Sequence, residues 1–69
     1  MKKPDISKFH FTPSELKIAR QLSTGASRKE MSANAGIAVD TLDAHLKNIR
    51  RKMHLVSSFR CGIILAQYF

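Results

Sequence analysis

Two helix-start signals of the same kind follow one another in the first half of this chain. Residues Thr12–Glu15 and Ser27–Glu30 each place a hydroxyl side chain at the N-cap and a glutamate at N3, which is the pattern of a capping box. Gly25 and Gly36 come after them, where a left-handed residue ends a helix. A chain of 69 residues holds one domain, so these signals predict short helices joined by tight turns.

The apolar residues that follow these signals recur at helical spacing. Leu16, Ala19 and Leu22, with Ile18 beside them, predict an apolar stripe on the first helix. Strand signals are weak, because no stretch alternates apolar and polar residues for long. We therefore predict an all-α, four-helix domain with helices at about residues 13–24, 28–35, 39–53 and 58–68.

The longest predicted helix, 39–53, is amphipathic. Five residues at helical spacing define its predicted buried side: Leu42, His45, Leu46, Ile49 and Met53. Its N-cap is poor, because Ala38 has no side-chain acceptor.

The fourth predicted helix, 58–68, is apolar on most of its surface. Ser57 suits its N-cap, and Phe59, Ile63 and Ala66 share one face. Four more apolar residues extend around the helix: Cys61, Ile64, Leu65 and Tyr68. A helix that is hydrophobic on most sides usually contacts a second partner.

The charge of the chain indicates an anionic partner. Twelve Lys and Arg residues against five Asp and Glu residues give a net charge of +7. A nucleic acid, a membrane surface or an acidic protein would fit this excess. The longest apolar run, 63–66, is too short to span a membrane, and residues 1–10 contain no apolar signal-peptide segment. We interpret residues 1–10 as a basic N-terminal tail or a linker remnant, and residues 11–69 as the domain.

The sequence does not predict an enzyme. A single cysteine, Cys61, excludes an internal disulfide. Together with His10, His45 and His54 it shows no metal-ligand spacing, and the serines lack a nucleophile-elbow or triad pattern. We expect no catalytic residue, no metal and no cofactor.

The second and third predicted helices, joined through Gly36-Ile37, fit a helix-turn-helix. In such a unit the second helix enters the major groove of DNA. Four basic residues crowd the later part of helix 39–53 and could neutralise phosphates: Lys47, Arg50, Arg51 and Lys52. Arg28 and Lys29 open helix 28–35, where free backbone N–H groups can bind phosphate.

Several of these motifs occur together at the spacing of one known family. They are Phe11-Thr12-Pro13-x-Glu15, Leu22, Gly25, Ser27-x-Lys29-Glu30-Met31, Gly36-Ile37 and Thr41-Leu42-x-x-His45-x-x-Asn48-Ile49-x-x-Lys52-Met53. On these motifs, residues 11–64 resemble the LuxR-type (GerE-like) helix-turn-helix domains of bacterial transcription regulators.

The resemblance implies sequence-specific binding of double-stranded DNA, with the third helix in the major groove. It implies a homodimer through the fourth helix on an inverted-repeat site. Base-facing positions would be Asp43, Ala44 and Lys47. Phosphate-contacting positions would be Ser27, Arg28, Lys29, Thr41, Arg50 and Arg51. For the dimer interface we expect Phe59, Cys61, Ile64, Leu65 and Tyr68.

Two departures from the family pattern concern this site. Asp43 stands where the family more often has a basic or polar residue, and its carboxylate could accept from cytosine N4 or repel phosphate. Ala38 replaces the usual capping serine.

Two other functions remain open from the sequence. The fold could serve as a protein-interaction module that binds another transcription regulator instead of DNA. A cationic membrane-active chain fits less well, because two capping boxes and two helix-ending glycines describe a globular fold. For the DNA-binding regulator we expect a cytoplasmic location at the bacterial nucleoid.

Overall fold

A computed structural model describes residues 5–69, so Lys2 and Lys3 of the predicted basic tail lie outside the described residues. The described chain forms a short 3-10 helix, η1 (Ile6–Phe9), and four α-helices: α1 (Pro13–Ser23), α2 (Arg28–Ala35), α3 (Val39–Met53) and α4 (Ser58–Leu65). No strand occurs within residues 5–69. The predicted all-α fold of four helices is therefore confirmed.

Both predicted capping boxes are formed. The Thr12 hydroxyl accepts from the Glu15 N–H at 3.2 Å, and the Glu15 carboxylate accepts from the Thr12 N–H at 2.9 Å. Ser27 and Glu30 repeat this exchange at 3.1 and 3.0 Å. Gly36 ends α2 in the left-handed conformation, with φ of 67°, which glycine adopts at little cost. The local chemistry of the chain thus sets the starts of α1 and α2.

The predicted end of the fourth helix was wrong, because α4 stops at Leu65 and not near residue 68. Beyond it, Gln67 and Tyr68 donate their N–H groups to carbonyls three residues back, Ile64 at 3.1 Å and Leu65 at 2.8 Å. This tighter winding lets Tyr68 pack edge-on against Phe9, with ring centroids 5.4 Å apart. A contact with the other end of the domain therefore accompanies the early end of α4.

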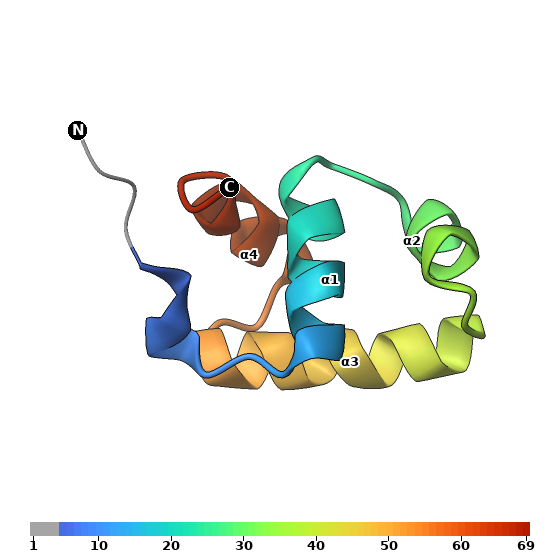
Figure 1. Ribbon diagram of the computed structural model, residues 1–69, viewed down its shortest axis with the longest axis horizontal. Coiled ribbons are helices and arrows are strands. Elements are labelled where there is room, and N and C mark those ends of the chain that lie inside the picture. The colour runs from blue at the N-terminus through green and yellow to red at the C-terminus, as the bar shows by residue number, and fades with distance from the viewer. Residues whose placement is uncertain (1–4) are drawn as a thin grey trace.

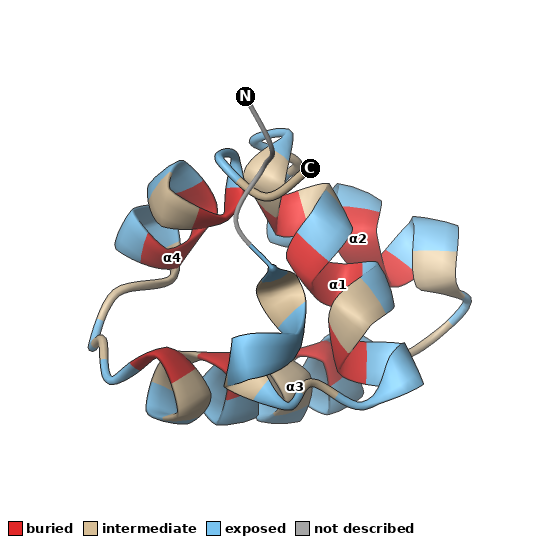
Figure 2. Ribbon diagram, turned by 60° about the vertical axis from the view of Figure 1, so that its left-hand side comes forward, coloured by how far each residue is buried: buried red, intermediate tan, exposed pale blue. Residues whose placement is uncertain are grey.

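The four helices pack with α1 in the middle. Helix α3 runs along one side of the domain, and α1 stands across it between α2 and α4 (Figure 1). Helix α1 contacts each of the other three helices. The inner sides of the helices carry the buried residues, and the outer side of α3 is largely exposed (Figure 2).

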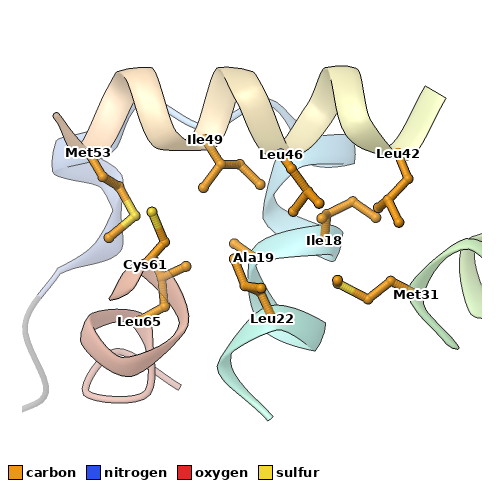
Figure 3. Close-up of a cluster of buried hydrophobic side chains, with 10 residues drawn as sticks. All are labelled: Ile18, Ala19, Leu22, Met31, Leu42, Leu46, Ile49, Met53, Cys61 and Leu65. Atoms are coloured by element: carbon orange, nitrogen blue, oxygen red, sulfur yellow. The ribbon is translucent and has the colours of Figure 1, made fainter. Parts of the chain in front are cut away.

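The hydrophobic core draws on all four helices (Figure 3). From α3, the side chains of Leu42, Leu46, Ile49 and Met53 point inward, as predicted. They meet side chains of the other three helices: Ile18, Ala19, Leu22, Met31, Cys61 and Leu65. His45, which was also predicted on the buried side of α3, is only half-buried.

Helices α1 and α4 approach each other at the backbone. Gly62 is buried in α4, and a Cβ atom at this position would lie 2.8 Å from the carbonyl oxygen of Leu22 in α1. A side chain at residue 62 would therefore push the two helices apart.

Residues 6–9 were predicted to belong to a tail, but they pack against the domain. Phe9 of η1 stacks on Phe11 with ring centroids 5.4 Å apart, and the Lys8 ammonium lies 5.2 Å from the Phe9 ring centroid and 5.5 Å from that of Tyr68. Aromatic and cation–π contacts of this kind each contribute about 0.5–1.5 kcal/mol. The packed unit therefore begins before residue 11.

A partly buried ion pair joins the start of α1 to the end of α3. The Glu15 side chain is almost fully buried and is hydrogen-bonded to the Lys52 ammonium, which also donates to the His10 carbonyl at 3.0 Å. Burial raises the pKa of Glu15, but the hydrogen bonds from Lys52 and Thr12 and the Lys52 charge outweigh it, so the net pKa is lowered from 4.5. Lys52, which the sequence grouped with the basic residues of this helix, is thus part of the structural framework.

Candidate nucleic-acid interface

The outer side of α3 is a surface that no other described helix covers (Figures 1 and 2). Asp43 and Lys47 are four residues apart and Ala44 and Lys47 are three apart, so the three side chains share this side. Ala44 and Lys47 are exposed, and Asp43 is half-buried. The structure therefore brings the three predicted base-facing residues together on one accessible face.

An open hollow of about 550 Å³ lies beside this face. Three helices contribute to it: α2 through Arg28, α3 through most of the lining, and α4 through Ser58. The α3 residues are Asp43, Ala44, Leu46, Lys47 and Arg50. All three predicted base-facing residues and two predicted phosphate ligands thus line one concave surface.

A bidentate ion pair spans α2 and α3 at this hollow. The Nε atom of Arg28 donates to Oδ1 of Asp43 at 3.0 Å, and Nη2 donates to Oδ2 at 2.5 Å. The two side chains remain 59% and 45% exposed. The two residues were predicted to make separate contacts with DNA, and their pairing was not predicted. The pairing neutralises the Asp43 carboxylate, at a position where the family more often has a basic or polar residue.

Arg50 is held between α3 and α4. Its Nη1 atom donates to the Ser58 hydroxyl at 2.8 Å, and the residue is half-buried. This bond fixes the guanidinium at the rim of the hollow. Arg51, by contrast, is exposed on α3.

The starts of α2 and α3 differ in how their backbone N–H groups are satisfied. At α2, the Ser27 hydroxyl accepts a hydrogen bond from the backbone N–H of Glu30. Lys29 is exposed in the same turn. At α3, Ala38 makes no side-chain hydrogen bond to the first turn, as predicted, and Thr41 is exposed there. The predicted phosphate-contacting residues that are exposed therefore lie at two helix starts and along α3.

The residues predicted for the dimer interface do not share one face of α4. Cys61 and Leu65 are fully buried in the core of the monomer, which leaves them no surface for a second copy, and this corrects their assignment to the interface. Phe59 is 76% exposed, whereas Ile64 and Tyr68 are half-buried. Because α4 is apolar on most of its surface, its composition alone does not tell which side faces the core.

The exposed apolar surface on and before α4 includes two residues absent from that prediction. Ile63 is 56% exposed and Val56 is 95% exposed. Ile63 lies four residues after Phe59, so the spacing already places both on one face. We define Phe59 and Ile63 as the α4 outer face.

The single cysteine of the chain, Cys61, is buried in the core. Burial raises the pKa of the Cys61 thiol more than the nearby Arg50 charge lowers it, so the thiol stays protonated at neutral pH. Within residues 5–69, no three His, Cys, Asp or Glu side chains gather in a group that could hold a metal ion. In the same range, no helix has the length and apolar character needed to cross a membrane.

Helices α2 and α3, joined by the tight turn at Gly36, have the arrangement of a helix-turn-helix. The family model described as bacterial regulatory proteins of the luxR family matches residues 10–61. The chain therefore belongs to the luxR family of bacterial regulatory proteins, as the resemblance implied.

One relative from Haemophilus influenzae is a "Nitrate/nitrite response regulator protein homolog". It is 35% identical to this chain over 53 residues, which cover 77% of the chain and 26% of the relative. The chain thus spans about a quarter of the length of this relative. No solved structure matched the chain significantly.

Proposed function

We propose that this domain binds double-stranded DNA in a sequence-specific manner, with α3 in the major groove and Asp43, Ala44 and Lys47 at the base edges. The observation that carries the proposal is the convergence of these three residues with the start of α2 on one exposed, concave surface. The major groove, about 12 Å wide, admits an α-helix, and the inner side of α3 is anchored in the core.

Phosphate contacts would flank the base-facing residues. Five of the six predicted phosphate-contacting residues are proposed as phosphate ligands, from the starts of α2 and α3 and the later turns of α3: Ser27, Lys29, Thr41, Arg50 and Arg51. The sixth, Arg28, is paired with Asp43. Such contacts supply affinity and orientation without reading sequence.

The proposed assembly is a homodimer in which the α4 outer face of one copy packs on that of the other. Exposed Phe59 and Ile63 support this arrangement, because large apolar residues in one exposed patch mark an interaction site. Two-fold symmetry of the dimer would select an inverted repeat with half-sites about one helical turn apart.

Replacing Lys47 by alanine tests the placement of α3. We expect the wild-type chain to enrich a palindromic motif from a randomised duplex pool at about 150 mM salt. Lys47→Ala is expected to lose preference at one position of each half-site, with affinity for the wild-type motif lowered about 5- to 150-fold. The matched control is Lys17→Ala, which removes the same charge from an exposed position of α1 outside the hollow. Equal retention of all duplexes by the wild-type chain would refute sequence-specific binding.

Replacing Phe59 by serine tests the dimer. Because the residue is 76% exposed, the monomer should fold normally, which a thermal melt would check. We expect binding to the palindrome to weaken at least about tenfold, as for an aromatic anchor of an interface, while binding to an isolated half-site stays unchanged. Unchanged binding to the palindrome would place the dimer contact elsewhere.

One observation favours a second candidate, a module that binds another transcription regulator. A largely apolar hollow of about 650 Å³ runs between α4 and the connection from α1 to α2, with Phe59, Ile63 and Ala66 on its α4 side. If this candidate is correct, the chain should show no affinity for duplex DNA at moderate salt. It should form a stoichiometric complex with a purified transcription regulator, and the variant Ile63→Ser should abolish that complex.

A further inference from the structure

We infer that Arg28, at the start of α2, reads a guanine base, and that Asp43 positions its guanidinium for this contact. The inference rests on the proposed placement of α3 in the major groove. It adds Arg28 of α2 to the residues that determine specificity. It also gives Asp43 a second role, which is to position the Arg28 side chain.

The geometry of the ion pair leaves one edge of the Arg28 guanidinium available to contact a base. A guanidinium carries five N–H donors, and Asp43 accepts from Nε and Nη2, which form one side edge. The remaining end edge presents N–H groups of Nη1 and Nη2 side by side. This fork matches O6 and N7 of guanine, which accept a bidentate contact from arginine in the major groove.

The location of the pair favours a base over a phosphate. The Arg28 guanidinium lies within hydrogen-bond distance of the Asp43 carboxylate, at 2.5 and 3.0 Å. If the carboxylate faces the base edges, as proposed, the guanidinium is at the same depth in the groove. Ala44 lines the same hollow, and its small side chain leaves room for a base edge there.

The pair contributes little to the stability of the fold. Water screens an ion pair this exposed, so its contribution to folding is small. Its larger effect would be on binding, because an arginine already held in one orientation loses less side-chain entropy when it contacts DNA. The pair also offsets the negative charge that Asp43 would otherwise bring close to the phosphates.

Lysine cannot substitute for Arg28 in this role. Its ammonium is a point charge, with no planar fork to contact Asp43 and a guanine together. Arg28→Lys therefore keeps the net charge and the electrostatic attraction to DNA but removes the proposed reading contact.

The test is selection from a randomised duplex pool with the wild type, Arg28→Lys and Asp43→Ala. We expect the wild-type motif to contain a guanine in each half-site whose preference falls at least about fivefold in Arg28→Lys. Asp43→Ala should weaken the preference at the same position, because it releases the guanidinium. Asp43→Asn, which retains one acceptor oxygen, should partly restore it. The matched control is Arg51→Ala, a proposed phosphate ligand, which should lower affinity uniformly and reduce the salt slope by about 1.

Three results would overturn the inference in distinguishable ways. An unchanged motif with uniformly weaker binding in Arg28→Lys would make Arg28 a phosphate ligand. Loss of a cytosine preference in Asp43→Ala, with the motif of Arg28→Lys unchanged, would make Asp43 the direct reader. Absence of any motif with the wild-type chain would refute the proposed function itself, and the inference with it.

Discussion

Replacing Ile49 by alanine is expected to lower the free energy of unfolding by about 2–5 kcal/mol. Ile49 is fully buried in the row of α3 side chains that face the other helices, so the truncation loses buried apolar surface and leaves a cavity (Figure 3). The whole domain should be stable by only about 3–10 kcal/mol, so the loss is a large part of the total.

Urea denaturation of both chains would measure the Ile49→Ala effect. The matched control is Ile49→Val, which removes one methylene group and should cost about 0.5–1.5 kcal/mol. If Ile49→Ala lowers the free energy of unfolding by less than about 1 kcal/mol, the helices must move in to fill the cavity. The core would then be less tightly packed than the structure shows.

Replacing Lys52 by methionine is expected to lower the free energy of unfolding by about 3 kcal/mol at neutral pH. Removing one partner of a buried pair leaves the other charge uncompensated, which costs about 3–5 kcal/mol. We expect the lower end of this range because the Lys52 side chain is 32% exposed and water screens part of the interaction.

The loss in Lys52→Met should depend on pH in a definite direction. The folded-state pKa of Glu15 is lowered, so the stabilisation by its ionised form is complete above its ordinary value of 4.5 and disappears as pH falls through the lowered pKa. Unfolding measured at about pH 7 and about pH 3 should therefore show the wild type and Lys52→Met converging in acid. The control is Lys17→Met on the exposed side of α1, which should change stability by less than about 0.5 kcal/mol. A loss of equal size at both pH values would contradict the role of the pair.

The starts of the helices were predictable from the sequence because they depend on local chemistry. Thr12 and Glu15 are three residues apart, and their exchange of hydrogen bonds needs nothing from the rest of the fold. The buried side of α3 was predictable for a similar reason, since polar residues on its other side leave one orientation for Leu42 and Ile49.

The end of α4 and the packing of η1 were not predictable, because they depend on contacts between distant parts of the chain. Tyr68 meets Phe9 across nearly the whole length of the sequence. Helix α4 offers apolar residues on every side, so helical period alone could not separate buried Cys61 from exposed Phe59.

Within the candidate site, the sequence supplied the residue types but not their pairing. Arg28 and Asp43 lie on different helices, and only the packing of α2 on α3 brings them into contact. The same holds for Lys52, whose charge suggested DNA until the fold placed it beside Glu15.

The close approach of Gly62 to Leu22 has a consequence for the spacer between two half-sites. With α4 seated on the backbone of α1, the α4 outer face and α3 belong to one rigid unit. In the proposed dimer, the distance and rotation between the two α3 helices would then follow from helix packing instead of a flexible linker. One added base pair turns a half-site by roughly 34–36° about the duplex axis, which a rigid dimer cannot follow without changing the twist of the DNA. The length of the spacer would thus be recognised as strictly as the bases on either side of it.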